Sequence, residues 1–217
     1  MKQRIVRLFP AALALMAGMA WSAGAAAQPF AAPPPWQQWY WSITAGSYRA
    51  EDNTRLAAPG SEIALGVAVG YRYSRHVSFE VEVPFFYAEY DTPATVPPPP
   101  YGTVEERSSV NTAGIVTNVV LNTGGQWVRA YVGAGAGLYW SRFSVSAQVF
   151  GYPGTYERDD SDVGTQWLTG ADLRVGRGSW LGLQYRQVDL RANFGSVTNA
   201  DVDLGGRFFL LAYRNGF

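Results

Sequence analysis

The chain has 217 residues, 47% of them hydrophobic and 16% charged, with a formal net charge of +0. This length favours a single domain, and the even charge balance provides no basic surface for binding nucleic acid through phosphate. The chain contains no cysteine, which excludes disulfides, thiolate metal sites and cysteine nucleophiles.

The N-terminus has the pattern of a secretory signal peptide. Lys2, Arg4 and Arg7 form a basic region, an apolar stretch covers residues 8–21, and Ala25-Ala26-Ala27 supplies small residues for cleavage. The apolar stretch is short for the roughly 20 residues of a spanning helix, so cleavage after Ala27 is favoured over a retained anchor. We predict a signal peptide at 1–27, a Pro-rich periplasmic lead-in at 28–38 and a folded domain at 39–217.

From Trp39 onward the chain repeats alternating apolar and polar segments, each about as long as a tilted strand that crosses a bilayer. Ile63, Leu65 and Val67, for example, alternate with small or polar residues. The predicted strands are Trp39–Arg49, Glu62–Tyr73, Val77–Tyr90, Ser108–Leu121, Trp127–Phe143, Val163–Val175, Ser179–Leu190 and Val202–Arg214.

The gaps between these segments alternate between long and short. The short gaps are 74–76, 122–126 and 176–178, and the long gaps are 50–61, 91–107, 144–162 and 191–201. Short periplasmic turns and long extracellular loops are typical of outer-membrane barrels. The sequence therefore predicts an all-β fold, an eight-stranded antiparallel up-and-down transmembrane β-barrel in the outer membrane.

Aromatic residues gather at the two ends of the predicted strands, where rings favour a membrane interface. The alternative is that these rings pack a core. The periplasmic set is Trp39, Trp41, Tyr71, Tyr73, Trp127, Trp180 and Tyr213, and the outer set is Tyr48, Phe85, Tyr87, Trp140 and Trp167.

Several segments resemble the small outer-membrane β-barrel superfamily that includes the OmpA transmembrane domain, OmpX and OmpW. They are Gly70-Tyr71-Arg72-Tyr73, Val77-Ser78-Phe79-Glu80-Val81, Tyr131-Val132-Gly133-Ala134-Gly135-Ala136-Gly137, Leu181-Gly182-Leu183-Gln184-Tyr185-Arg186 and the terminal Phe217. The resemblance implies an assembly signal, read by the barrel-assembly machinery, on the last strand. Its residues would be Phe209, Leu211, Tyr213 and Phe217, interrupted by Asn215.

Alternation leaves open which face of the strands points inward. If the apolar face meets lipid, the lumen receives Arg72, Glu80, Glu82, Arg129, Asp172, Arg174 and Arg186. Eight strands leave an interior that side chains just fill, and buried charges are costly unless they are paired. We therefore expect a paired polar plug, with an ion path or gate as the alternative.

Other candidate features lie near the strand ends. His76, the single histidine, falls in a periplasmic turn, away from the outer leaflet where known barrel enzymes use a histidine with a serine, so we expect no enzymatic activity of that type. The proline-rich loop 92–101 favours polyproline II and could contact a partner or be a plain surface loop. The acidic cluster Glu157, Asp159, Asp160 and Asp162 lacks EF-hand spacing, so a solvated charge run is favoured over a calcium site.

The alternation continues through residues 144–150, past the predicted membrane edge. We expect the fifth and sixth strands to extend outward as a hairpin, similar to the fin of OmpX, whose edge can bind proteins by strand addition. The leading functional hypothesis is a non-enzymatic envelope barrel without cofactor or metal. Its expected partners are outer-membrane lipid, lipopolysaccharide and an extracellular protein. The alternatives are a narrow channel for small solutes and a soluble lipocalin-like periplasmic binder with its apolar face inward.

Overall fold

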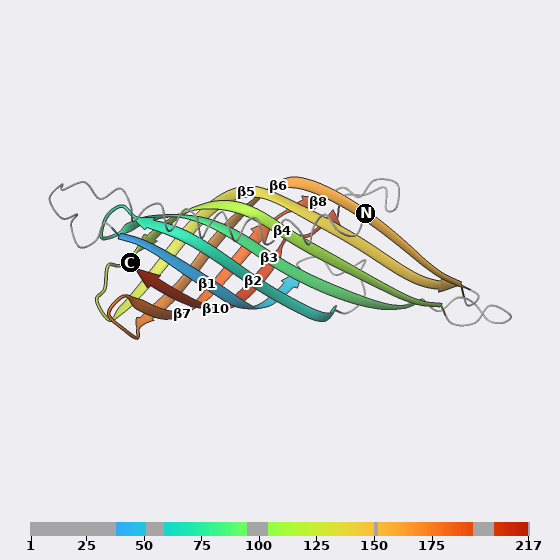
Figure 1. Ribbon diagram of the computed structural model, residues 1–217, viewed down its shortest axis with the longest axis horizontal. Helices are drawn as coiled ribbons and strands as arrows, with labels where there is room; N and C mark the ends of the chain where they lie inside the picture. Colours follow the sequence, from blue (N-terminus) through green and yellow to red (C-terminus); the bar gives the residue numbers. More distant parts are fainter. Residues whose placement is uncertain (1–37, 51–58, 95–103, 150–151, 193–201, 217) are drawn as a thin grey trace, which may run out of the picture.

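The strands of the chain close into a barrel. The computed structural model describes residues 38–50, 59–94, 104–149, 152–192 and 202–216. Eight strands form a closed barrel in the order β1-β10-β7-β6-β5-β4-β3-β2, with every pair antiparallel (Figure 1). The wall strands are β1 (Gln38–Ala50), β2 (Pro59–Arg72), β3 (Val77–Ala94), β4 (Val104–Asn122), β5 (Val128–Val149), β6 (Tyr152–Arg174), β7 (Ser179–Asp189) and β10 (Gly206–Gly216). The predicted fold class is confirmed. Within the described ranges, no helix has the length and apolar character needed to span a bilayer.

The predicted eighth strand, Val202–Arg214, is divided in the structure. Its first residues form β9 (Val202–Asp203), which pairs with β8 (Arg191–Ala192) instead of joining the barrel wall. The backbone amides of Leu204 and Gly205 then both donate to the carbonyl of Leu190. The wall strand begins only at Gly206, because Leu204 is 2% exposed and its burial redirects the chain.

Residues along each wall strand alternate between the lumen and the outer surface. On β2, Ala64 and Ala68 are buried, whereas Ile63 is 51% exposed and Leu65 is 48% exposed. The same alternation leaves large apolar side chains on the outside of the other wall strands, as in Val81, Ile115, Val132, Leu183 and Leu211. An apolar outer surface is what a barrel in lipid requires. The lipocalin-like alternative would need this apolar face to point inward.

Most of the predicted interfacial aromatics are exposed or half-buried on the outside of the barrel. Those of the periplasmic set lie near strand ends, whereas Phe85, Trp140 and Trp167 lie within β3, β5 and β6, which continue past the wall. Near the short turns, Trp39 packs on Tyr71 with ring centroids 5.1 Å apart, and Trp41 packs on Tyr213 at 5.5 Å. Two assignments are wrong. Trp180 lies at the lumen-facing position between Gly178 and Gly182 and its ring packs under Arg129. Tyr48 is buried in the lumen at 2% exposure.

The short connections are tight turns, as predicted. The backbone amides of Tyr73 and Ser74 donate to the carbonyl of Val77, and that of Val175 donates to Ser179. Gly124 has a φ of 68°, in the left-handed region that favours glycine. Its amide donates to Oδ1 of Asn122 at 3.0 Å, which closes the turn between β4 and β5.

Four neighbouring strands continue past the end of the barrel wall. β2 pairs with β3 up to Pro59 and Tyr90, and β7 pairs with β6 from Asp189 and Thr165 onward. Beyond these points β3, β4, β5 and β6 stay paired with one another, and β5 and β6 reach the pair Val149 and Tyr152 (Figure 1). We call this extension the protruding sheet, and we call residues 142–149 and 152–159 the protruding hairpin.

The extension of the fifth and sixth strands is confirmed, and the third and fourth strands extend as well. The predicted long gap 144–162 is therefore wrong over most of its length, and the predicted gap 91–107 is wrong at both of its ends, because strand covers 91–94, 104–107, 144–149 and 152–162. Pairing with a neighbouring strand satisfies the backbone there and overrides the polar, turn-like composition.

Candidate functional site

The lumen near the short turns contains a buried carboxylate held by two arginines. Arg129 Nε donates to Oδ2 of Asp172 at 2.8 Å, and Arg214 NH1 donates to Oδ1 at 2.6 Å. The side chains of Arg129, Arg214 and Asp172 are 9%, 6% and 1% exposed. Arg129 and Asp172 are direct cross-strand partners on β5 and β6, so register alone brings them together. We call Asp172, Arg129 and Arg214 the lower ion cluster.

Neutral polar groups and rings complete the coordination of these arginines. Arg214 NH2 donates to the Tyr131 hydroxyl at 3.0 Å and to Oε1 of Gln184 at 2.8 Å. Its guanidinium also lies 4.6 Å from the centroid of the Tyr131 ring, and that of Arg129 lies 4.3 Å from the Trp180 ring. These contacts give NH2 of Arg214 two acceptors and place both guanidinium groups against aromatic rings, which helps to offset the cost of burying them.

Glu80 lies beside this cluster and is satisfied by a tyrosine. The Tyr40 hydroxyl donates to Oε1 of Glu80 at 2.6 Å, and both residues are buried. Arg72 lies 5.9 Å from the centroid of the Tyr40 ring. Arg174 is set apart from the network, because β6 ends there: its Nε and NH2 donate to the carbonyls of Gly176 and Arg177 in the turn.

A second polar layer crosses the middle of the barrel. Arg186 NH2 donates to Oε1 of Glu82 at 2.5 Å, and both side chains are 3% exposed. Asn118 Nδ2 donates to Oε2 of Glu82 at 3.3 Å, and Gln166 Nε2 donates to Oδ1 of Asn118 at 2.7 Å. Tyr139 closes the layer with a hydrogen bond from its hydroxyl to Oε1 of Gln166 at 3.3 Å. β3, β4, β5, β6 and β7 all contribute, so the layer links most of the wall.

Lumen-facing glycines provide the space for these polar side chains. A Cβ on Gly182 would collide with Oδ1 of Asp172, and one on Gly170 would collide with the Tyr131 hydroxyl. Likewise, a Cβ on Gly66 would lie 2.7 Å from Oε1 of Glu82. Small residues on one strand therefore face large polar ones on another, which is how a narrow barrel accommodates them.

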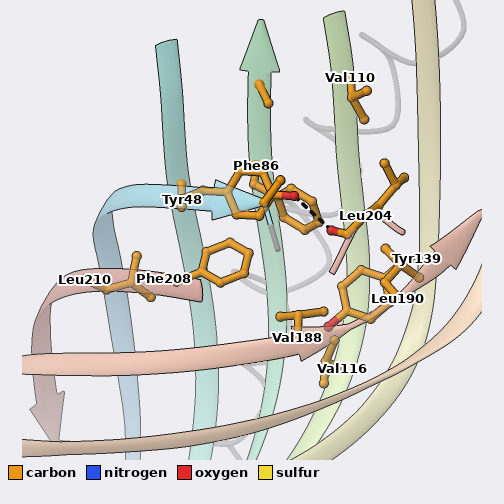
Figure 2. Packing of buried hydrophobic residues seen from close by; sticks show 13 residues of the cluster. Tyr48, Phe86, Val110, Val116, Tyr139, Val188, Leu190, Leu204, Phe208 and Leu210 are labelled. Carbon is orange, nitrogen blue, oxygen red and sulfur yellow. Dashed lines mark hydrogen bonds between the residues drawn. The ribbon is translucent and has the colours of Figure 1, made fainter. Parts of the chain in front are cut away.

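The half of the lumen nearer the long connections is apolar. Tyr48, Phe86 and Phe208 form an aromatic cluster with ring centroids 4.8–5.3 Å apart. Figure 2 shows these rings together with Val116, Tyr139, Val188, Leu190, Leu204 and Leu210. The Tyr48 hydroxyl donates to the carbonyl of Leu204 at 2.9 Å and ties the β9–β10 connection over the cluster. We call this set of residues the apolar layer.

The lumen contains a small cavity near the short turns. The cavity beside the lower ion cluster, between Tyr40, Glu80 and Arg214, measures about 10 Å³, about the volume that one water molecule requires. The layers above it contain the buried Gln166 and Phe86 and similar packed side chains. A stack of two polar layers and one apolar layer thus fills the barrel.

Six of the seven predicted lumen charges lie on the lumen face of the barrel, namely Arg72, Glu80, Glu82, Arg129, Asp172 and Arg186. They do not form one network, because Glu82 and Arg186 belong to the middle layer. Sequence reasoning missed Arg214, which shares the face of the buried Leu210 and Ala212 on β10. Five further polar residues of the lumen were also missed, although each lies at an inward position of the alternating pattern, which could have identified them. They are Tyr40, Asn118, Tyr131, Gln166 and Gln184.

The remaining candidates lie outside the lumen. Nδ1 of the exposed His76 lies 3.0 Å from the carbonyl oxygen of Asn122, in a turn. In the acidic cluster, Asp159 accepts from Arg142 Nε at 2.6 Å and from NH2 at 2.9 Å. No group of three or more metal-ligating side chains occurs among the described residues. Of the assembly signal, Phe209 and Leu211 are exposed and Tyr213 is half-buried on the outer surface of β10. Phe217, the signal peptide and most of the loop 92–101 lie outside the described residues.

Comparisons with known proteins assign this architecture to a family. Residues 11–208 match the family described as "Outer membrane protein beta-barrel domain". Neisserial surface protein A is similar in fold, with a TM-score of 0.52, 19% identity, and coverage of 82% of this chain and 97% of that one. The N-terminal β-barrel domain of Pseudomonas aeruginosa OprF has a TM-score of 0.42 and 14% identity, and the match covers 83% of this chain and 98% of that one. Ail, the attachment invasion locus protein of Yersinia pestis, has a TM-score of 0.41 and 14% identity, and the match covers 82% of this chain and 98% of that one. No curated protein matches. The chain belongs to the outer-membrane β-barrel protein family and is a small barrel protein of the outer membrane.

Proposed function

We propose that this protein is a non-enzymatic component of the envelope that acts at the cell surface through its protruding sheet and not through its lumen. The observation that carries the proposal is the continuation of β3, β4, β5 and β6 beyond the barrel wall. In outer-membrane barrels the long connections face the outside of the cell. The protruding sheet therefore extends into the medium, where it can meet another protein.

The outer edge of β6 is the part of this sheet best suited to a partner. Among the described residues, 152–164 pair with β5 on one side, and the pairing with β7 begins only at Thr165. An edge of this kind can accept an extended segment by strand addition. Glu157, Asp159 and Asp162 are exposed along it. Arg142 pairs with Asp159, and Arg158 is the one exposed base among residues 157–162, so the net charge stays negative and favours a segment that carries basic residues.

A narrow channel is the second candidate function, and the water-sized cavity beside Asp172 favours it. The apolar layer opposes it, because an ion that passed Phe86 and Phe208 would lose its hydration without gaining a polar contact. We expect refolded protein in planar bilayers to give no steady single-channel events. Regular conductance steps would replace the proposed surface function with transport.

A shortened hairpin tests the surface function directly. Ser144 and Glu157 are direct cross-strand partners, so replacing residues 145–156 with the turn Asn-Gly leaves a closed hairpin. We expect cells that express this variant to lose adhesion and cell–cell contact, while the barrel keeps its compact, heat-modifiable migration on a detergent gel.

A lumen variant supplies the matched control. Gln166→Leu alters the middle layer without touching the protruding sheet, so adhesion should persist in cells that carry it. If the shortened hairpin leaves adhesion unchanged, or if both variants lower adhesion equally, the protruding sheet is not the functional surface.

A further inference from the structure

The short turns at one end of the barrel carry positive charge and no acid. The turns that join β2 to β3, β4 to β5 and β6 to β7 contain two exposed arginines, Arg75 and Arg177, and neither aspartate nor glutamate. Arg174 adds a third, half-buried arginine at the end of β6. The acids nearest to these turns along the chain, Glu80 and Asp172, are 6% and 2% exposed and lie in the lumen. We call Arg75, Arg174 and Arg177 the basic rim.

The opposite end of the barrel carries exposed charges of both signs. Glu157, Asp159 and Asp189 are exposed there, and so are Arg158 and Arg191. Among the described residues, exposed charge of a single sign is therefore found at the short turns. Such a surface attracts anions without competition from acids of its own chain.

Backbone carbonyls of the turns hold two of the rim arginines in position. Arg174 donates from Nε to the carbonyl of Gly176 and from NH2 to that of Arg177, both at 3.0 Å. Arg75 donates from Nε to the carbonyl of Gly124 at 3.4 Å. Within the described ranges, no carboxylate pairs with any of the three rim arginines. Since each guanidinium has five N–H donors, both arginines keep donors for an anion, and a side chain already held in place loses less entropy on binding.

Exposed aromatic residues place the basic rim at the level of the membrane interface. Tyr73 is 61% exposed and lies two residues before Arg75, and Trp127 is 71% exposed at the end of the turn between β4 and β5. Tyrosine and tryptophan favour the level of the lipid headgroups. Long arginine side chains extend along an apolar surface to place their charge at the same level. The rim guanidinium groups therefore lie within reach of headgroup phosphates.

We propose that the basic rim binds anionic phospholipid of the periplasmic leaflet. Short turns of outer-membrane barrels face the periplasm, so the rim meets the phospholipid leaflet. Arginine matches phosphate oxygens with two parallel hydrogen bonds, and each basic residue beside an anionic lipid surface strengthens association about fivefold. A zwitterionic headgroup offers the same phosphate but carries a compensating positive charge. The rim therefore prefers phosphatidylglycerol to phosphatidylcholine.

The length of the turns favours lipid over the cell wall as the partner. Carboxylates of peptidoglycan are also anions of the periplasm, but turns this short keep the rim arginines at the surface of the bilayer. The lipid site and the proposed surface function fail separately, because they lie at opposite ends of the barrel. The shortened hairpin removes no residue of the basic rim, and rim variants leave the protruding sheet intact.

The test is an NMR titration of isotope-labelled, refolded protein in uncharged detergent micelles, with phosphatidylglycerol and with phosphatidylcholine. The signals observed are the backbone amides and the Nε–H groups of the arginines. We expect phosphatidylglycerol to shift the signals of Arg75, Arg174 and Arg177 and to bind at least about fivefold more tightly than phosphatidylcholine. Equal affinities for the two lipids, or equal shifts at Arg158 and Arg191, would overturn the site. This comparison uses wild-type protein and needs no variant.

A triple variant locates the preference. Arg75→Gln, Arg174→Gln and Arg177→Gln together should reduce the preference for phosphatidylglycerol to within about twofold. Heat-modifiable migration verifies that this variant folds.

The matched control removes the same charge from the opposite end, through Arg49→Gln, Arg158→Gln and Arg191→Gln, and should keep the preference of wild-type protein. Equal loss in both triple variants would mean attraction by net charge alone and would overturn the site. Sedimentation of wild-type protein with purified peptidoglycan, lost in the rim variant and without any preference between the lipids, would assign the rim to the cell wall instead.

Discussion

Arg214 of β10 and Asp172 of β6 form an ion pair of 2.6 Å although β7 separates their strands in the wall. The same carboxylate binds Arg129 on the neighbouring strand β5. One acid thereby links three strands across the lumen, and it does so where all three side chains are buried. The lower ion cluster is therefore a structural tie between three strands, and we expect its loss to lower the stability of the whole barrel.

Asp172→Asn should strongly destabilise the barrel, because it leaves Arg129 and Arg214 buried without a counter-charge. Breaking a buried pair from one side costs about 3–5 kcal/mol. Urea titration of refolded protein in lipid vesicles, followed by tryptophan fluorescence, measures this loss in the free energy of unfolding.

Asp159→Asn is the matched control for that variant. Asp159 also binds an arginine, but its side chain is 56% exposed, and solvent-exposed pairs contribute about 0–1 kcal/mol. If both substitutions lower the free energy of unfolding equally, the lower ion cluster is not the tie that we infer.

Gly182→Ala should destabilise the barrel through crowding, because the new methyl group would collide with Asp172 and with the carbonyl of Ala171. Overpacking costs about 1–3 kcal/mol. Gly176→Ala provides the comparison: its Cβ would lie 3.4 Å from that of Ser179, an ordinary contact, so an effect below about 0.5 kcal/mol is expected. The same urea titration distinguishes them, and a neutral Gly182→Ala would contradict the packing described.

Tyr48→Phe should loosen the cover of the apolar layer. The substitution keeps the ring but removes the hydrogen bond to the carbonyl of Leu204, worth about 1 kcal/mol. Amide hydrogen exchange at Leu204 and Gly205, which donate to Leu190, should accelerate about fivefold. Tyr213→Phe, at the opposite end, should leave these amides unchanged. Equal exchange in all three proteins would mean that the hydroxyl does not secure this segment.

The pair between Arg142 and Asp159 predicts a pH dependence confined to the protruding hairpin. The hydrogen bond from Arg142 lowers the pKa of the Asp159 carboxyl below its ordinary value of 3.8. A carboxyl whose folded pKa is lowered stabilises the fold above the ordinary pKa, and this contribution disappears as the pH falls through the lowered value. NMR titration of the side-chain carboxyl carbon should place the midpoint below 3.8, and Arg142→Gln should return it to the ordinary value. An unchanged midpoint in the variant would exclude this cause.

Strand alternation was sufficient to group the residues that share a face, but it left open which face points inward and what each layer of the lumen contains. Once the apolar face is assigned to lipid, Glu82 lies inward because the outward Val81 and Val83 flank it. Arg186 lies inward because it alternates with the outward Leu183 and Tyr185 on β7. Arg174 lies at an inward position of β6, as Asp172 does, but the strand ends at Arg174. Its guanidinium group therefore donates to carbonyls of the turn instead of an acid. Alternation along a strand decides whether a side chain faces the lumen. The partner of that side chain depends on its position along the barrel axis.

The apolar layer shows the second limit of sequence reasoning. Tyr48 resembles an interfacial aromatic because it lies near a strand end, and Phe86 adjoins the outward Phe85. The register of β1 against β10 pairs Tyr48 with Phe208, and Phe86 of β3 meets both rings inside the closed barrel. Register across strands that are far apart in sequence depends on closure of the barrel, and no local pattern encodes it.

The order of the layers also makes the two mouths of the barrel unequal. The polar lower ion cluster lies nearer the mouth at the short turns, while the apolar layer with Leu190 and Leu204 lies nearer the mouth at the long connections. On the proposal that the lumen does not conduct, abundance and leakiness are uncoupled: a cell can insert many copies of this barrel into the outer membrane without opening paths through its permeability barrier.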